Sequence, residues 1–146
     1  MGAFGGPDII TDGLVFAIDA GSTRSYPGSG TTGTDLISSE SITLNNGVGF
    51  STDKGGTWTF DGSDDYIQTS FGQNIVSTGF SVNFWFNVTG TATCFFMQMY
   101  VTADSNTVFR VERNSAGSNS IEFGHSANGG PISGNELIST NFPNDV

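Results

Sequence analysis

The feature that most constrains this fold is a series of short apolar segments separated by turns rich in Gly, Asn, Ser and Asp. The clearest segment is Phe80–Val88, in which Phe or Val occupies every second position and Ser81, Asn83, Trp85 and Asn87 lie between them. Such a period of two is typical of a β-strand with one apolar and one polar face. Trp85 falls on the polar face, where we expect a loop or a second packed layer to cover it.

Strand-like segments occur along the rest of the chain as well. Leu14–Ile18 is a continuous apolar run between two turns, which predicts a strand buried on both faces. No stretch longer than about ten residues combines helical periodicity with caps, and residues 128–146 are expected to be mostly loop. The other predicted strands, in chain order, are Ser41–Leu44, Thr57–Phe60, Tyr66–Thr69, Cys94–Val101, Val108–Glu112 and Ile121–Phe123.

The stretch Gly55–Ile67 holds two of these strands on either side of an acidic turn. Asp61 and Gly62 give the backbone the freedom that a tight reversal needs, so we expect the two flanking strands to pair as a hairpin. In the same way, Ile121–Phe123 is expected to pair with Val108–Glu112.

The spacing of the strands predicts the architecture. Strands roughly 8–12 residues apart, with turns between them, predict an all-β, antiparallel β-sandwich of the jelly-roll kind. A length of 146 residues suits one domain. We therefore expect one domain over residues 12–146, preceded by an arm or attachment segment over residues 1–11, where several Gly residues and Pro7 discourage regular structure.

The charge balance limits the partners. The formal net charge is −10, and Lys and Arg together number only 4. Phosphate groups are bound by clustered Lys and Arg, so neither nucleic acid nor an anionic membrane surface is an expected partner. No apolar segment approaches the ~20 residues of a membrane span, and the first residues lack the basic start and apolar core of an export signal. The Ser, Thr, Asn and Gly content is typical of extracellular or particle-surface β proteins.

Catalytic chemistry has few candidates. The glutamates are Glu40, Glu112, Glu122 and Glu136. No two of them occupy same-face positions on one strand, so we expect no glycosidase-type carboxylate pair. His125 is the only histidine, without identifiable partners for nucleophilic catalysis. We therefore expect a protein that is not an enzyme. Cys94, the only cysteine, is expected to be a buried small hydrophobe.

One cluster of acidic residues is a candidate metal site. Asp61, Asp64 and Asp65 lie within five residues of one another, and carboxylate oxygens suit Ca²⁺. A calcium ion needs six to eight oxygen ligands, however, and this run lacks the ligand order of an EF-hand. The preferred interpretation is a turn in which Asp61 caps the backbone while the other two carboxylates face solvent.

Aromatic residues supply candidates for carbohydrate binding, in which an exposed ring stacks on a sugar face beside hydrogen-bonding groups. The candidates are Tyr26, Trp58 and Tyr66, and Trp85 and Tyr100 are further possible platforms. The last four also fit a role in the core or between sheets, and Trp58 and Trp85 do so more readily than the others. Tyr26 lies in a Ser/Gly-rich loop, which favours exposure.

Three segments, in this order, resemble the concanavalin A-like, laminin-G-like jelly rolls found in structural proteins of T4-like marine tailed phages. Leu14–Ala20 followed by Ser25–Thr32 resembles the opening of these domains. The segment Phe60–Ile67, Phe-Asp-Gly-Ser-Asp-Asp-Tyr-Ile, and the strand Gly79–Phe86 resemble two later motifs of the same family. The resemblance implies a jelly roll, and it implies a packing role for Tyr26.

Two departures from the family pattern matter. Gly33 stands where the family has a tryptophan, and Ile37–Thr43 replaces a loop rich in Gly and Asn. The chain also ends at Val146, about where the family begins a later strand. Two interpretations follow: this is the N-terminal part of a longer chain, or a shortened domain that a neighbouring subunit completes. We prefer the first.

The resemblance implies a non-enzymatic structural protein of a phage particle, displaying a lectin-like jelly roll on the particle surface as a head decoration or a tail or fibre component. Its partners would be other virion proteins, further copies of itself and, through adhesion, a host surface glycan. It would be made in the host cytoplasm without a signal peptide. The alternative is a carbohydrate-binding module of a bacterial surface or secreted protein, which predicts an export signal or a linker to a larger enzyme.

Overall fold

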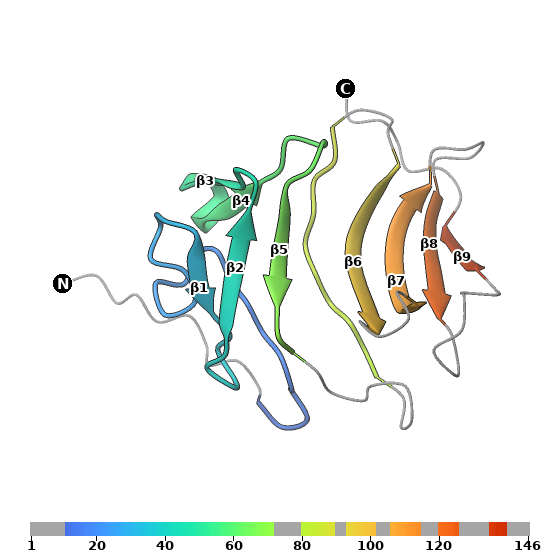
Figure 1. Ribbon diagram of the computed structural model, residues 1–146, viewed down its shortest axis with the longest axis horizontal. Helices are drawn as coiled ribbons and strands as arrows, with labels where there is room; N and C mark the ends of the chain where they lie inside the picture. Colours follow the sequence, from blue (N-terminus) through green and yellow to red (C-terminus); the bar gives the residue numbers. More distant parts are fainter. Residues whose placement is uncertain are drawn as a thin grey trace. The chain divides into compact units, whose positions relative to one another are not determined.

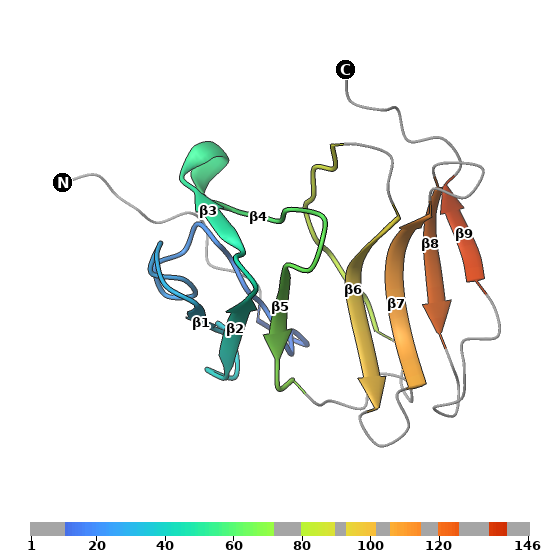
Figure 2. The ribbon, with the colours of Figure 1, turned by 45° about the horizontal axis from the view of Figure 1, so that its top comes forward.

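The computed structural model describes residues 11–71, 80–89, 93–101, 106–114, 120–125 and 135–139. In these residues the regular structure is β-strand, apart from one 3-10 turn, η1 (Asp53–Gly55), and all strand pairs are antiparallel (Figures 1 and 2). The strands are β1 (Thr32–Thr34), β2 (Ser41–Asn45), β3 (Gly49–Ser51), β4 (Thr57–Thr59), β5 (Tyr66–Thr69), β6 (Cys94–Val101), β7 (Asn106–Asn114), β8 (Ser120–His125) and β9 (Asn135–Ser139). The predicted all-β, antiparallel fold class is confirmed, whereas the jelly-roll topology stays a prediction.

Two compact units make up the chain, Met1–Gln73 and Asn74–Val146. The first holds a three-stranded sheet in the order β1-β2-β5 and a two-stranded sheet, β3-β4. The second holds a four-stranded sheet in the order β6-β7-β8-β9. The single domain predicted over residues 12–146 stays a prediction, and the predicted arm lies almost wholly outside the described residues. No helix in the described ranges is long and apolar enough to cross a membrane.

The core of the first unit lies between its two sheets. Ile42 and Leu44 of β2 are 0% and 4% exposed, because every second side chain of this strand points inward. Tyr26 is the third buried member of the cluster. The partly buried side chains packed against these three come from the chain before β1, from the turn between β2 and β3, and from β3, β4 and β5: Phe16, Ile18, Val48, Phe50, Trp58 and Ile67. Two sheets that share one core form a small sandwich within this unit.

The predicted strand at Leu14–Ile18 is wrong. This segment has no strand ladder, and Val15 is 50% exposed, so the run is not buried on both faces. Its polar backbone is satisfied elsewhere: the Ala17 N–H donates to Asp35 Oδ1 (2.7 Å), and the Ala17 carbonyl accepts from the Leu36 N–H (2.8 Å). The Asp35 carboxylate and the Leu36 N–H therefore supply the hydrogen bonds that a neighbouring strand would otherwise supply.

The predicted hairpin around Asp61 is also wrong, although both of its strands exist. β4 pairs with β3, and β5 pairs with β2, so the two strands belong to different sheets. The segment Phe60–Asp65 is a corner that carries the chain from one sheet to the other. The chain leaves β2 for β3 through Asn46 and Gly47, which both have positive φ, and the Asn46 side-chain amide donates to the carbonyl of Asp64 across the corner (2.8 Å).

The second unit is built on three predicted strands and one unexpected one. β6, β7 and β8 confirm the strands expected there, and the pairing of β7 with β8 is confirmed as well. β9 was not predicted: it lies within residues 128–146, which were expected to be mostly loop and of which the structure describes only Asn135–Ser139. One face of this sheet is apolar and buries Phe109, Val111 and Ile121, with partly buried side chains packed around them: Phe96, Met97, Met99 and Phe123.

The segment Phe80–Val88 is not assigned as a strand, contrary to its alternating pattern. Its Phe side chains nevertheless share one side, as the pattern predicts. Phe80 contacts the rings of Phe109 and Phe123, with ring centroids 4.9 and 6.3 Å apart. The segment thus lies against the apolar face of the β6–β9 sheet without joining its hydrogen-bond ladder.

Candidate functional site

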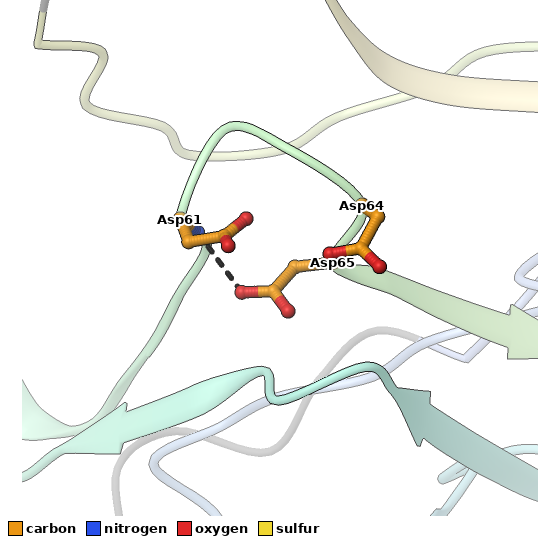
Figure 3. Close-up of side chains that lie close together, drawn as sticks. All are labelled: Asp61, Asp64 and Asp65. Carbon is orange, nitrogen blue, oxygen red and sulfur yellow. Dashed lines mark hydrogen bonds between the residues drawn. The ribbon is translucent and has the colours of Figure 1, made fainter.

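The corner between β4 and β5 gathers the three candidate metal ligands (Figure 3). Asp61, Asp64 and Asp65 each offer one carboxylate oxygen, and these oxygens lie within 4.8 Å of one another. The corner brings them together because it reverses the chain over five residues. Asp61 and Asp64 are exposed, whereas Asp65 is half-buried.

Hydrogen bonds within the corner fix its shape. The Ser63 N–H donates to Asp61 Oδ1 (2.8 Å), so Asp61 caps the turn as the preferred interpretation holds. Asp65, in contrast, turns partly inward: its Oδ2 accepts from the Asp61 N–H (2.9 Å). Its Oδ1 is buried and has no hydrogen-bond partner among the described residues.

The cluster of Asp61, Asp64 and Asp65 offers some of the oxygen ligands that a hard cation requires. Three carboxylates supply at least three oxygens and the negative charge that Ca²⁺ favours. A complete calcium shell takes six to eight oxygens, so the three would need further ligands from water or a bound partner such as a sugar hydroxyl. Calcium binding at these residues stays a prediction.

Tyr66 is an exposed aromatic residue next to this cluster of three aspartates. It follows Asp65 directly, begins β5 opposite Asn45 of β2, and is 48% exposed. The next residue, Ile67, packs into the core, so the alternation of the strand turns Tyr66 outward. Of the three residues predicted to bind carbohydrate, Tyr66 is the one that is exposed, as stacking on a sugar requires.

Tyr26 and Trp58 lie in the core of the first unit. Tyr26 is 3% exposed, its hydroxyl donates to the Gly30 carbonyl (2.8 Å), and its ring contacts those of Phe50 and Trp58 at centroid distances of 5.3 and 5.9 Å. Trp58 is half-buried, and its indole Nε1 has no hydrogen-bond partner in the described part of the chain. The predicted exposure of Tyr26 is therefore wrong, and both positions match the packing roles also considered for these residues. They leave little ring face for a sugar; binding by either residue stays a prediction.

A shallow cavity of about 270 Å³ opens beside Tyr26. Pro27 and Phe50 give it apolar walls, and Thr23 and Thr52 add hydroxyl groups at its edge. Two loops meet here so closely that a Cβ at Gly21 would lie 2.2 Å from the Gly55 carbonyl oxygen. The cavity is slightly below the usual range of ligand pockets, about 300–1,000 Å³.

The sequence analysis missed one carboxylate pair. Glu112 of β7 and Glu122 of β8 are direct cross-strand partners, 5% and 7% exposed. The expectation considered only same-face positions on one strand, whereas these two glutamates share a face across two strands. The predicted pairing of these two strands, carried to the level of register, would have placed the glutamates together.

The environment of this pair is that of a structural ion pair. Arg110, two positions before Glu112 on the same face of β7, places its Nη2 2.9 Å from Glu112 Oε1. Both carboxylates are covered, so a substrate could not reach them without a rearrangement of the sheet. The ion pair with Arg110 compensates the buried charge of Glu112, so this burial gives little support for a catalytic role.

Cys94 is partly buried at the start of β6. Burial raises the pKa of its thiol, against the opposing effect of the nearby Arg113. The thiol is therefore protonated at neutral pH, which makes it a poor nucleophile and a poor metal ligand.

A comparison of the chain with models of known protein families, with curated proteins and with solved structures gives no match.

Proposed function

We propose that this chain is a non-enzymatic structural protein of a tailed-phage particle, which displays its β-sandwich domain on the particle surface and adheres there to host glycans. The position on the particle would be that of a head decoration or of a tail or fibre component. Its partners would be other virion proteins and further copies of the chain. Three ordered motifs that resemble phage jelly rolls support the particle role.

The observation that carries the adhesion role is the corner between β4 and β5. It presents Tyr66, 48% exposed, directly beside carboxylates whose oxygens lie within 4.8 Å of one another. An aromatic ring supplies a stacking surface for the apolar face of a sugar, and carboxylates accept hydrogen bonds from its hydroxyls. If Ca²⁺ binds to the corner, it can also accept sugar hydroxyls as ligands.

The particle role is tested by mass spectrometry of purified virions, followed by antibody labelling and electron microscopy of the particles. We expect the chain in a stoichiometric amount at one fixed location on the surface. A protein found free in lysates and never in particles would contradict the proposal. Recovery from the bacterial cell surface would favour the alternative, a bacterial carbohydrate-binding module.

The adhesion role at the corner is tested by retention of whole particles on host cells. Particles that carry Tyr66→Ala, and native particles in EDTA, are expected to lose retention at least tenfold. Asp12→Asn is a suitable control, because Asp12 is exposed and lies outside the corner. Equal retention of all variants, with and without EDTA, would argue against a role of the corner.

A further inference from the structure

Trp85 is the most exposed large apolar side chain in the part of the chain that the structure describes. It is 98% exposed, whereas Phe84 and Phe86 on either side of it are 37% and 43% exposed. The loop or second packed layer expected to cover Trp85 is not found among the described residues. The large apolar face of its indole is therefore open to a ligand that can stack on it.

The neighbours of Trp85 explain why it points outward. Phe84 and Phe86 both contact the ring of Phe96 in β6, with ring centroids 5.7 and 4.3 Å apart. These contacts fix the even-numbered positions on the side of the β6–β9 sheet. Trp85 lies between them and projects to the other side, as alternation along a drawn-out segment requires.

The same outward side carries polar groups on both sides of the ring. Asn83 and Asn87 lie two positions before and after Trp85, and both are exposed. Two residues of extended chain span about 7 Å, so each amide stands within reach of a group stacked on the indole. We name these three residues, together with the exposed Ser81, the Asn-Trp-Asn face.

The chemistry of the Asn-Trp-Asn face matches a neutral sugar. Each asparagine amide offers two donors and an acceptor, which is what the hydroxyl groups of a sugar need, and the indole offers a flat apolar surface. No Asp, Glu, Lys or Arg occurs in Phe80–Val88, and the whole chain carries a formal charge of −10. An acidic glycan would meet repulsion and no cation on this face, so a neutral one fits better.

We propose that the Asn-Trp-Asn face is a binding site for a neutral glycan, with a sugar ring stacked on Trp85 and its hydroxyls bonded to Asn83 and Asn87. The inference rests on the proposed adhesion to glycans and adds a second site to it, separate in sequence from the Asp61–Tyr66 corner. The two sites differ in chemistry, because stacking on the Asn-Trp-Asn face uses no carboxylate and needs no metal.

Tryptophan fluorescence of the full chain tests this site directly. The chain contains only two tryptophans, so Trp58→Phe leaves Trp85 as the single reporter. This background substitution removes an indole N–H that has no hydrogen-bond partner among the described residues. The probes are a soluble mixed-linkage β-glucan and a galactomannan as neutral polysaccharides, with alginate as the acidic one.

We expect one of the neutral polysaccharides to shift the emission of Trp85 to shorter wavelength, with the same titration in EDTA. In affinity electrophoresis, Trp85→Ala should weaken binding at least tenfold, and Asn83→Ala or Asn87→Ala several-fold. Phe95→Ala is the matched control, since Phe95 is another exposed aromatic, 56% exposed, on the same unit. It should leave binding unchanged, and circular dichroism checks that every variant keeps its strand content.

Several results would overturn the inference: no binding of either neutral polysaccharide, tighter binding of alginate, or unchanged affinity of a folded Trp85→Ala variant. An emission shift that follows protein concentration alone would also overturn it, because a second protein surface would then cover the ring. Recovery of the native chain in purified particles without any glycan binding would reject this site and leave the particle role intact.

Discussion

Asp35 shows how one side chain organises the loops of the first unit. It is 1% exposed and accepts hydrogen bonds from the backbone N–H groups of Ala17, Ile37 and Ser38, at 2.7, 3.3 and 2.7 Å, and from the Ser38 hydroxyl. Burial by itself would raise the pKa of this carboxyl, but the four hydrogen bonds outweigh it and hold the pKa below its ordinary value. The ionised form is therefore the one that the fold favours.

Asp35→Asn is expected to lower the free energy of unfolding at pH 7 by about 2–3 kcal/mol, because hydrogen bonds to a charged acceptor are lost and an amide N–H₂ faces donors. Urea denaturation followed by circular dichroism measures the change. Asp53→Asn serves as control, since Asp53 is exposed, and it should shift stability by less than about 0.5 kcal/mol.

The same carboxyl predicts a pH dependence. Because the folded-state pKa of Asp35 is lowered, its contribution is present above the unfolded-state pKa of about 3.9 and is lost as the pH falls through the folded-state value. The stability difference between the native chain and Asp35→Asn should shrink over that acid range. A difference that stays constant from pH 7 to the acid limit would show that ionisation of Asp35 does not stabilise the fold.

At the scale of elements, glycines set how closely strands and loops approach. A Cβ at Gly33 of β1 would lie 2.6 Å from the backbone carbonyl oxygen of Ser25, whereas a Cβ at Gly49 of β3 would lie 2.4 Å from the Thr59 hydroxyl. The first obstacle is backbone, and the second can rotate away. A larger side chain at position 33 would not fit this arrangement.

Gly33→Ala should therefore cost about 2 kcal/mol or more in unfolding free energy, and Gly49→Ala distinctly less. Neither glycine has a positive φ, so the comparison isolates steric contact from backbone strain. Thermal melts of the two variants under identical conditions decide the order. The reverse order would mean that the close approach of β1 to the Ser25 loop is not maintained in solution.

The sequence predicted strands better than it predicted their partners. Alternation identified β2, β5 and β8, because inward and outward positions differ in polarity along one strand. It could not show that β4 and β5 join different sheets, since this depends on the turn at Asn46 and Gly47 and on the Asn46–Asp64 hydrogen bond. Pairing is a contact between distant residues, and local pattern carries little information about it.

In the candidate site, too, local pattern predicted neighbours in sequence but not contacts between distant residues. The Asp61–Asp65 group was predictable because its members are neighbours in sequence. The facing of Glu112 and Glu122 was not, because it requires the register between two strands. Leu14–Ile18 was misjudged for a third reason: its composition suits a strand, but a buried side chain, Asp35, bonds to its backbone instead.

For the whole molecule, the charge distribution sets solution behaviour. The chain has 14 Asp and Glu residues against 4 Lys and Arg, and its isoelectric point is about 4.1. Net charge keeps protein surfaces apart, so solubility should be lowest near pH 4 and should rise on either side of it. Light scattering across a pH series measures this; a minimum at neutral pH would mean that the exposed Phe and Trp side chains control association instead.

The strand that carries Tyr66 has a consequence for how this protein could change over evolutionary time. The ring is positioned by the ladder between β5 and β2, in which Tyr66 faces Asn45, and by Ile67 in the core beside it. The corner before it contributes side chains but does not hold the strand in place. If the corner binds a ligand as proposed, substitutions of the exposed side chains of Ser63 and Asp64 can alter which ligand is recognised while Tyr66 stays in place, so these two positions could vary more readily than Asp61, whose carboxylate caps the turn.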